Sequence, residues 1–298
     1  MALLRKVICS PREGGYLLSF HAMASPCEVL IDVDDQPLAI LVGNKVAEEA
    51  WRIEDKYSRY QKTSVCGQLN FNAGQPSPID EETFLLLQFA EQCYQISDGL
   101  FDITSGVLRK VWRFDCSDNV PSQAEINEVL PDVGWHKVSF DEKNFIMQKK
   151  MEIDFGGIGK EYAVDKALLI AGEMTKAPIL INFGGDLAVN GPRENNQAWQ
   201  VGIEHPCIVD DKSMVVSIIQ GAIATSGDAQ RFLLKNGKRF SHILNVITGW
   251  PVENPPKSIT VAAPKCIQAG LLSTLALLQG ASASEFLQSQ EIKHWVIK

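Results

Sequence analysis

The 298-residue sequence has no apolar run of about 18 residues, the length that a helix needs to cross a bilayer, so we expect no membrane insertion. It also has no excess of basic residues, because 28 Lys and Arg stand against 36 Asp and Glu, for a formal net charge of −8. Phosphate contacts need clustered positive charge, so the composition argues against nucleic acid as a partner. No repeat of roughly 20 to 50 residues recurs, which excludes solenoids and propellers.

Close cysteine pairs are absent as well. The seven cysteines stand at positions 9, 27, 66, 93, 116, 207 and 266, and none has the Cys-x-x-Cys spacing of a zinc ribbon or a redox pair. This dispersed spacing predicts reduced thiols packed in a core. The segment before Cys9 is too short and too charged for the apolar part of a signal peptide, so we expect a cytoplasmic protein.

The sequence has enough apolar residues for a core, since 45% of the chain is hydrophobic. Periodicity predicts helices with strands meandering between them, a pattern that favours an α+β fold over a doubly wound parallel sheet. The predicted helices are 38–57, 81–96, 125–130, 161–174 and 267–278; the predicted strands are 27–33, 137–140, 144–148, 179–182, 199–204, 214–219, 223–225, 239–244 and 258–262.

Several common motifs fail in this chain. The segment Gly156–Glu161 resembles a phosphate-binding loop, but the Walker spacing needs four residues between its glycines and a hydroxyl residue after Lys160. A dinucleotide-binding turn fails because Tyr162 occupies the place of its third glycine. Neither a Gly-x-Ser-x-Gly elbow nor a His-Glu-x-x-His zinc helix occurs.

Three glycine-rich turns remain, and each follows a predicted strand. Glycine lets the backbone approach a phosphate closely, and a helix start offers unpaired N–H groups. One such turn alone is commonly just a tight turn, but three with polar or acidic partners in one half of the chain indicate a polyphosphate ligand. This interpretation requires that the turns converge in space. The turns are Asp154–Lys160, Asn182–Asp186 and Ala224–Asp228.

Two further segments carry chemical groups. Leu100–Gly106 places an acid and two hydroxyls beside an aromatic ring. Ser241–Pro251 places His242 in a predicted strand, followed by a Thr-Gly turn. A lone histidine in a strand is usually a structural residue, so His242 by itself does not identify a function.

Taken in order, these segments resemble the FAD:protein FMN transferases, the ApbE-type flavin transferases. The resemblance runs from about Phe20 to Gly280. Its specific parts are a Gly-Gly-Ile-x-Lys-x-Tyr-Ala-x-Asp segment that ends at Asp165 and a Ser-His-Ile segment at Ser241–Ile243. The looser landmarks are His21–Cys27, Tyr57–Tyr60, Asp98–Thr104, Ile181–Asp186, Ala224–Asp228 with Arg231, and Ala263–Leu275.

The resemblance implies an α+β fold of mixed or antiparallel sheets with packed helices and a central FAD cleft. It divides the chain into an N-terminal extension, residues 1–19, and one domain, residues 20–298, which could consist of two interlocked α/β lobes. It implies transfer of the FMN half of FAD to a Ser or Thr hydroxyl of a target flavoprotein, with release of AMP. Magnesium (Mg²⁺) normally bridges the pyrophosphate in such enzymes, and some relatives hydrolyse FAD to FMN and AMP instead. The oligomeric state stays open.

The resemblance also implies roles for individual residues. His242 is the candidate general base, Lys160 would offset phosphate charge, and Thr225 would assist them. Tyr60 lies near the position that separates transferase from hydrolase activity in the family, and its aromatic ring favours transfer. The candidate FAD-binding residues are Met23, Ser25, Tyr60, Leu100, Phe101, Asp102, Tyr162, Asp165 and Ile243.

The implied metal site departs from the family pattern at one position. By register, its ligands are the carbonyl oxygen of Gly159 and the hydroxyl of Thr274, whereas Gly270 stands where the family has an Asp. Magnesium prefers oxygen ligands that commonly include a carboxylate, so this loss predicts weakened binding. One alternative function is therefore an FAD-binding protein with little or no turnover, in which Gly270→Asp should raise activity. The others are a magnesium-dependent FAD pyrophosphatase and a non-enzymatic interaction protein.

Overall fold

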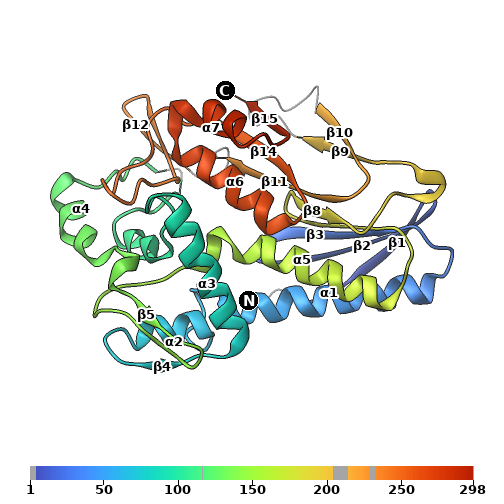
Figure 1. The fold of residues 1–298 in the computed structure, drawn as a ribbon, viewed down its shortest axis with the longest axis horizontal. Coiled ribbons are helices and arrows are strands. Elements are labelled where there is room, and N and C mark those ends of the chain that lie inside the picture. Colours follow the sequence, from blue (N-terminus) through green and yellow to red (C-terminus); the bar gives the residue numbers. More distant parts are fainter. Residues whose placement is uncertain (1–4, 116, 204–213, 228–231, 298) are drawn as a thin grey trace.

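One antiparallel sheet organises the protein. The computed structural model describes residues 5–115, 117–203, 214–227 and 232–297 (Figure 1). Its eight-stranded sheet has the order β1-β2-β3-β7-β8-β11-β14-β15, and each neighbouring pair is antiparallel. The α+β class with antiparallel sheets is thus confirmed. The strands are β1 (Ile8–Arg12), β2 (Gly15–Ala22), β3 (Ser25–Ile31), β7 (Ile179–Phe183), β8 (Asp186–Val189), β11 (Gly221–Gly227), β14 (Ser258–Ala263) and β15 (His294–Ile297).

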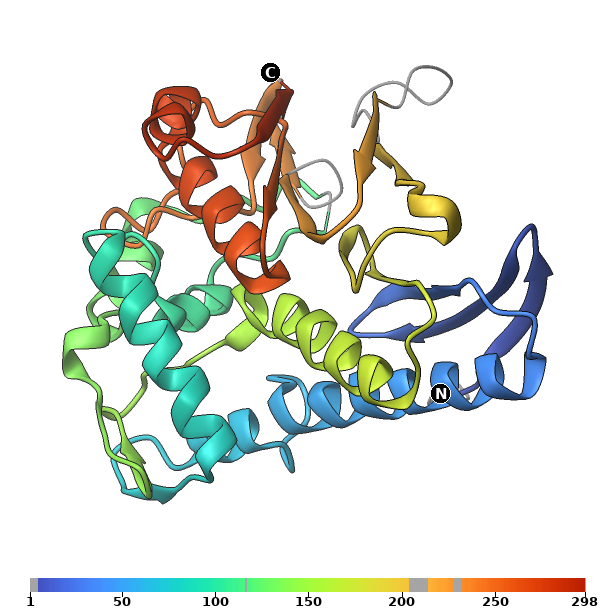
Figure 2. The same cartoon turned by 45° about the vertical axis from the view of Figure 1, so that its right-hand side comes forward.

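Three helices cover one face of this sheet (Figures 1 and 2). Apolar residues recur along α1 at the spacing of one helix face, and this face is buried in the main core. Gly43 allows a close approach there, because a Cβ on it would lie 2.4 Å from Cγ of Leu18 in β2. The helices are α1 (Gln36–Tyr57), α5 (Gly159–Met174) and α6 (Cys266–Leu278), and α7 (Ala283–Ser289) follows α6.

The opposite face of the sheet carries a second core. Alternate residues of a strand point to opposite faces, so Ile181 joins the helix-covered core and Leu180 joins the second one. A two-stranded ribbon, β9 (Trp199–Ile203) and β10 (Met214–Ile218), contributes Trp199 and Val216 to this second core. Because both faces are covered, the central strands read as continuous apolar runs.

The chain between α1 and α5 forms a lobe beside the sheet (left in Figure 1). The indole N–H of Trp112 donates to the carbonyl of Gly249 at 2.8 Å, which ties this lobe to the segment that carries His242. The elements of the lobe are α2 (Val65–Phe71), β4 (Ser77–Pro78), α3 (Glu81–Ile96), a 3-10 helix (Ile103–Lys110), α4 (Gln123–Val129), β5 (Ser139–Phe140) and β6 (Asn144–Ile146); β12 (Phe232–Lys235) and β13 (Lys238–Ser241) come later in the chain. Shorter 3-10 helices span Leu130–Asp132, Trp135–Lys137, Phe155–Gly157, Glu194–Asn196 and Gly280–Ser282.

The predicted elements agree with the structure where periodicity is strong. The helix at 81–96 is observed with the predicted bounds, and the other predicted helices differ by a few residues at their ends. The strand predicted over 239–244 ends at Ser241, and β1, β2, β8, β12, β15, α2 and α7 were not predicted. The predicted boundary between residues 19 and 20 falls inside β2, so residues 8–19 belong to the main sheet.

The cysteines that the structure describes are free, and Cys27, Cys66, Cys93 and Cys266 are buried, as predicted. In the described ranges, no helix is both long and apolar enough to cross a bilayer. Several residues named from the sequence lie outside the described residues: Cys116, Glu204, Cys207, Asp228 and Arg231.

We predict that Gly43→Ala destabilises the fold, because the added methyl group would press on Leu18 and separate α1 from the sheet. The expected loss in the free energy of unfolding is about 1–3 kcal/mol, measured by urea denaturation. Gly172→Ala in α5 is the matched control, since nothing lies within 4 Å of its Cβ position. That variant should gain about 0.5–1 kcal/mol from helix propensity. Equal behaviour of the two variants would contradict the packing argument.

Candidate functional site

Antiparallel pairing brings the glycine-rich turns to one edge of the main sheet. Cys27 at the start of β3 pairs with Phe183 at the end of β7, so the β2–β3 turn lies beside the β7–β8 turn. β11 runs antiparallel to β8, with Ile223 opposite Leu187, so its end at Gly227 reaches the same edge. The second and third glycine-rich turns are therefore neighbours in space.

The carboxylate of Asp186 connects all three turns. Asp186 is 2% exposed and begins β8, in the second turn. Its Oδ2 lies 2.7 Å from Nζ of Lys160, which belongs to the first turn, and its Oδ1 accepts the N–H of Thr225 in the third turn at 3.1 Å. The convergence that the sequence interpretation required is thus observed.

This bridge also fixes the charge of Lys160. Burial disfavours the ammonium group, but the neighbouring carboxylate of Asp186 outweighs it and raises the pKa of Lys160. Lys160 therefore stays protonated at neutral pH, and its side chain remains partly exposed. A fixed, partly accessible positive charge beside three turns is suited to a phosphate group.

Two neighbouring hairpin turns at this edge adopt the left-handed backbone conformation, with positive φ. Gly184 and Gly185 have φ of 61° and 97°, and Met23 and Ala24 have φ of 52° and 57°. A two-residue hairpin loop of type I′ needs positive φ at both positions, which glycine adopts easily and Met and Ala do not. Ser25 packs on the glycine turn, because a Cβ on Gly184 would lie 2.7 Å from its Oγ. Met23 and Ser25 therefore lie at the same edge as Lys160.

The first turn is held at both ends. Asp154 accepts the N–H of Gly156 at 3.0 Å and is paired with Arg59 at 2.5 Å. The ring of Phe101 packs against Gly157, where a Cβ would lie 3.1 Å from the ring. The helix α5 then starts at Gly159, and among the described residues no side chain caps its first N–H groups. Such a start can receive an anion.

The third turn contacts α6 through hydroxyl groups. The Oγ of Ser226 lies 3.0 Å from Oγ1 of Thr274 and 2.8 Å from Oγ of Ser273. Ser273 in turn donates to the carbonyl of Gly270 at 2.9 Å. Thr225 also takes part, since its hydroxyl lies 2.8 Å from that of Thr260. The predicted metal ligand Thr274 is therefore adjacent to the third turn.

An additional carboxylate lies between α5 and α6. Glu161 is 7% exposed, and within the described part of the chain its Oε2 has no hydrogen-bond partner. Burial, with the negative charge of Asp186, raises the pKa of Glu161 to about 8. A Cβ on Gly270 would lie 2.5 Å from Cγ and 2.7 Å from Oε1 of Glu161. The side chain of Glu161 therefore fills the space above Gly270.

Three groups here are of the kind that a hard cation prefers, because all are oxygen ligands. They are the hydroxyl of Thr274, the backbone carbonyl of Gly159 and the unpartnered carboxylate oxygen of Glu161. Among the described residues, no cluster of three or more His, Cys, Asp or Glu side chains could hold a metal ion. A cation here would therefore need phosphate oxygens and water to complete its shell.

Sequence reasoning missed Asp186, Glu161 and Ser226 as site residues. Asp186 directly follows the Gly-Gly pair of the second turn, and Glu161 directly follows Lys160. Both acids were visible, but their proximity depends on strand pairing and on helix packing. Nothing in the local sequence shows that Glu161 points toward α6.

Two predicted FAD-binding residues have structural partners. Asp165 accepts the N–H groups of Cys266 and Ile267 at 2.9 and 3.0 Å, so it caps α6 from α5. Asp102 accepts the backbone N–H groups of Thr104 and Trp135 at 2.7 and 2.9 Å. Both carboxylates therefore organise the backbone around the site.

The hydroxyl of Tyr162 is directed to an ion-pair cluster between α1 and α3. It donates to Glu82 at 2.8 Å, and Arg52 and Lys56 pair with the same carboxylate. Burial opposes the negative charge of Glu82, yet these hydrogen bonds hold its pKa at about 2. Tyr162 thus links α5 to α1 and α3, and this polar contact does not involve the three glycine-rich turns.

The remaining candidates have contacts of their own. The ring of His242 meets that of Phe114 edge-on, with centroids 6.2 Å apart, and Ile243 packs against the main core. Tyr60 is 75% exposed, and its hydroxyl accepts from Arg59 at 3.0 Å. Leu100 is half-buried. Through Arg59, Tyr60 is connected to Asp154 at the head of the first turn.

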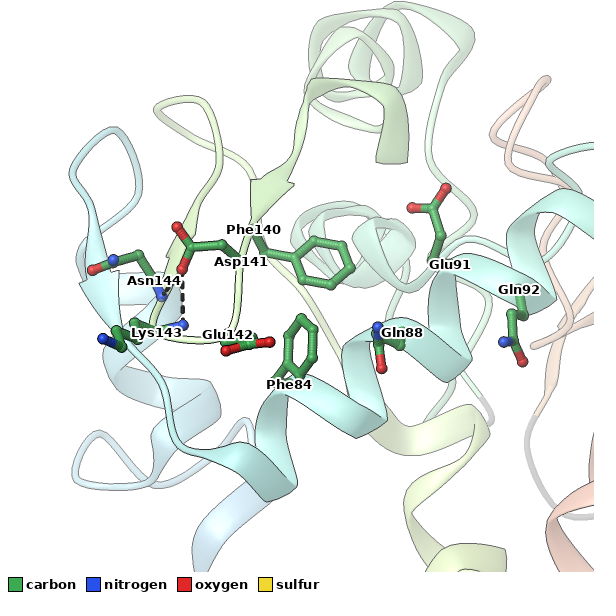
Figure 3. Close-up of a pocket in the computed structure, with 9 residues that line it drawn as sticks. All are labelled: Phe84, Gln88, Glu91, Gln92, Phe140, Asp141, Glu142, Lys143 and Asn144. Carbon is green, nitrogen blue, oxygen red and sulfur yellow. Dashed lines mark hydrogen bonds between the residues drawn. The ribbon is translucent and has the colours of Figure 1, made fainter.

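Two pockets lie away from these residues. One of about 680 Å³ lies between α3 and the β5–β6 turn, where the rings of Phe84 and Phe140 meet edge to face with centroids 6.0 Å apart (Figure 3). The other, of about 630 Å³, is lined by β10, β11, β14 and β15. Neither is lined by a residue predicted for the site, so the candidate site is defined by the contacts between the turns.

Comparison with known proteins identifies similar chains. A profile of the ApbE family matches residues 23–296. An FAD:protein FMN transferase of Klebsiella pneumoniae is 29% identical over 267 residues, which are 87% of this chain and 81% of the relative. One from Haemophilus influenzae is 26% identical, over 82% of this chain and 75% of the relative.

Solved structures agree with this result. The crystal structure of the ApbE protein from Thermotoga maritima is 29% identical and superposes with a TM-score of 0.86, covering 94% of this chain and 93% of that one. The flavinyl transferase ApbE of Pseudomonas stutzeri, in its apo form, has a TM-score of 0.83 at 23% identity, with 99% and 92% of the two chains covered. The observed fold is therefore the ApbE fold.

We predict that Glu82→Gln removes a pH-dependent part of the stability. The pKa of Glu82 is depressed in the folded protein, so its contribution is present above about pH 4.5 and is lost as the pH falls toward 2. At pH 7 the variant should lose about 1–3 kcal/mol of unfolding free energy, and the difference from wild type should shrink at acid pH. Urea denaturation across this range measures it. The exposed Glu48→Gln should change stability by less than about 0.5 kcal/mol; a pH-independent Glu82→Gln effect would contradict the assignment.

Proposed function

Because the chain belongs to the ApbE family, we propose that it transfers the FMN half of FAD to a Ser or Thr hydroxyl of a target flavoprotein and releases AMP. The observation that carries this proposal is the Asp186 bridge, which gathers three glycine-rich turns at the uncapped start of α5. Backbone N–H groups and a fixed ammonium group at one edge are what a diphosphate needs. FAD contains such a diphosphate.

The proposed reaction exchanges one phosphorus–oxygen bond for another. The acceptor hydroxyl oxygen forms a bond to the phosphorus of the FMN half, and the anhydride bond to the AMP half breaks. AMP leaves with the electron pair of that bond, and the hydroxyl proton passes to a base. Catalysis of this kind depends mainly on positioning and on stabilising charge at the phosphate oxygens.

Each part of the site has a role in this scheme. Lys160, held by Asp186, would neutralise charge that develops on the diphosphate. His242 would accept the hydroxyl proton. Met23 and Ser25 stand at the edge beside the glycine turn, and Phe101 packs on the first turn, so these three would contact the bound FAD.

Magnesium would be held by the Gly159 carbonyl and the Thr274 hydroxyl, together with phosphate oxygens and water. When bound, it supplies positive charge against the diphosphate. Ser226 fixes the hydroxyl of Thr274 through a 3.0 Å contact. This contact would orient the proposed ligand Thr274 before any substrate binds.

A second candidate function is FAD binding without efficient turnover, and Gly270 favours it because α6 offers no carboxylate there. An FAD pyrophosphatase is the third candidate, in which water replaces the acceptor hydroxyl. The three differ in their products. Transfer gives a flavinylated protein and AMP, hydrolysis gives FMN and AMP, and binding alone gives neither.

We predict that the protein, with FAD, magnesium and a target domain that carries an acceptor Ser or Thr, adds one FMN to the target. Intact-mass spectrometry of the target detects the adduct, and chromatography should detect AMP in equal amount. Changing the acceptor Ser or Thr to Ala in the target is the control and should abolish both products. AMP formed at an equal rate without any target would instead identify a hydrolase.

We predict that His242→Ala lowers the rate of FMN transfer by about 10²–10⁴-fold, because no base then accepts the hydroxyl proton. FAD affinity, measured by quenching of flavin fluorescence, should stay within about three-fold, since the proposed base does not hold the diphosphate. His294→Ala in β15 is the matched control and should leave transfer unchanged. A His242→Ala enzyme with the wild-type rate would remove His242 from the mechanism.

A further inference from the structure

The side chain of Glu161 is buried without a full set of partners. It lies in the first turn of α5, is 7% exposed, and has an Oε2 atom with no hydrogen-bond partner in the described ranges. Leaving such an oxygen unpaired in the interior destabilises a fold, because the carboxylate loses its hydration and receives little in return. A buried, unpaired carboxylate oxygen therefore points to a ligand.

The position of this carboxylate relative to Gly270 is specific. The three atoms nearest to a Cβ on Gly270 all belong to Glu161: Cγ at 2.5 Å, Oε1 at 2.7 Å and Cδ at 2.9 Å. An aspartate at position 270 would hold its carboxylate oxygens two bonds from that Cβ. The Glu161 carboxylate thus occupies the region that an aspartate carboxylate on α6 would reach.

The charges around Glu161 also favour a cation. Asp186 and Asp165 act on it with like charge, and Lys160 is the opposing charge that acts on it from the same helix. Lys160 is already paired with Asp186 at 2.7 Å. A divalent cation beside Glu161 would favour the ionised form of this carboxyl group, because carboxyl groups bind metals as carboxylates.

We propose that Glu161 supplies the carboxylate ligand of the divalent cation, in place of the one that Gly270 lacks. The carboxylate then comes from α5 instead of α6, but it lies in the same region of the site. Gly159, two residues earlier, offers its carbonyl, and Thr274, one helical turn after Gly270, offers its hydroxyl. The inference rests on the proposed function for the presence of a cation, but its test below does not require turnover.

The geometry also changes what Gly270→Asp alone should do. Its Cβ would collide with Glu161, so the single substitution displaces one carboxylate while adding another. We therefore expect little or no gain from this variant. The informative exchange is Glu161→Ala combined with Gly270→Asp, which removes the colliding atoms and returns a carboxylate to α6.

The test measures metal binding directly. MnCl2 is titrated into the FAD-saturated protein, and free Mn²⁺ is followed by its electron paramagnetic resonance signal, with FAD alone as the blank. Glu161→Gln keeps the shape and removes the charge, and we expect it to weaken Mn²⁺ binding by at least about ten-fold. Its melting temperature without metal should equal or exceed that of wild type, because Gln keeps the shape and removes a buried acid whose charged form burial disfavours.

The exchange variants supply matched controls. Glu161→Ala with Gly270→Asp should bind Mn²⁺ at least about five-fold more tightly than Glu161→Ala with Gly270→Ala, because the two differ by one carboxylate. If neither double variant folds, the difference in Mn²⁺ affinity between Glu161→Gln and the wild-type protein still tests the proposal.

Wild-type Mn²⁺ affinity in Glu161→Gln, or a large loss of its metal-free stability, would overturn the proposal and make Glu161 a structural residue. Absence of Mn²⁺ binding in the wild-type protein would overturn it too. Failure of the proposed transferase function is separate: it would show as normal, Glu161-dependent Mn²⁺ binding with no FMN adduct on any target.

Discussion

The candidate site depends on the ion pair between the buried Asp186 and the partly exposed Lys160. Asp186 begins β8 and reaches Lys160 on α5 and the backbone of Thr225 on β11, so a single carboxylate sets the distances between three turns that are far apart in the sequence. A buried carboxylate is stable only when its oxygens have partners. Here one oxygen of Asp186 pairs with the Lys160 ammonium group, and the other accepts the N–H of Thr225. Removing Asp186 would leave the partly exposed Lys160 ammonium group without its carboxylate partner and free the third turn from the second. The turns, the start of α5 and the hydroxyl cluster on α6 are one site because this pair holds them together.

The sequence predicted the parts of the molecule whose information is local. The helix at 81–96 has a cap at Asp80 and an apolar face, and its bounds were found correctly. The hairpin of β1 and β2 was missed because its alternation is weak: Cys9, Tyr16 and Leu17 are intermediate rather than cleanly buried or exposed. The family resemblance implied that Asp102 and Asp165 bind FAD, and the sequence motif alone does not show that these acids also accept backbone N–H groups. Their partners, Trp135 and Cys266, lie 33 and 101 residues away, and only the fold brings them near.

The hydroxyl groups of the site show the same contrast between local sequence information and contacts that only the fold creates. Thr274 was located by register with a family pattern, whereas Ser226, which orients it, belongs to another element and carries no signal of its own. Glu161 follows Lys160 directly, yet its side chain turns toward α6 because glycine at position 270 leaves room for it. The space left by a missing side chain can thus determine where a neighbouring carboxylate lies. A sequence motif describes the residues that are present and does not show such a space.

The cap that Asp165 forms on α6 has a wider consequence. It fastens the beginning of one helix to the middle of another, so the two backbones that face each other across the oxygen cluster keep a constant relative position. With the scaffold fixed in this way, a functional group can migrate from one backbone to the other during evolution without any rearrangement of the chain. A sequence comparison then shows a lost acid at one position and an unrelated acid at another, and an enzyme of this kind could be classed as inactive although its metal ligand has only moved to another helix.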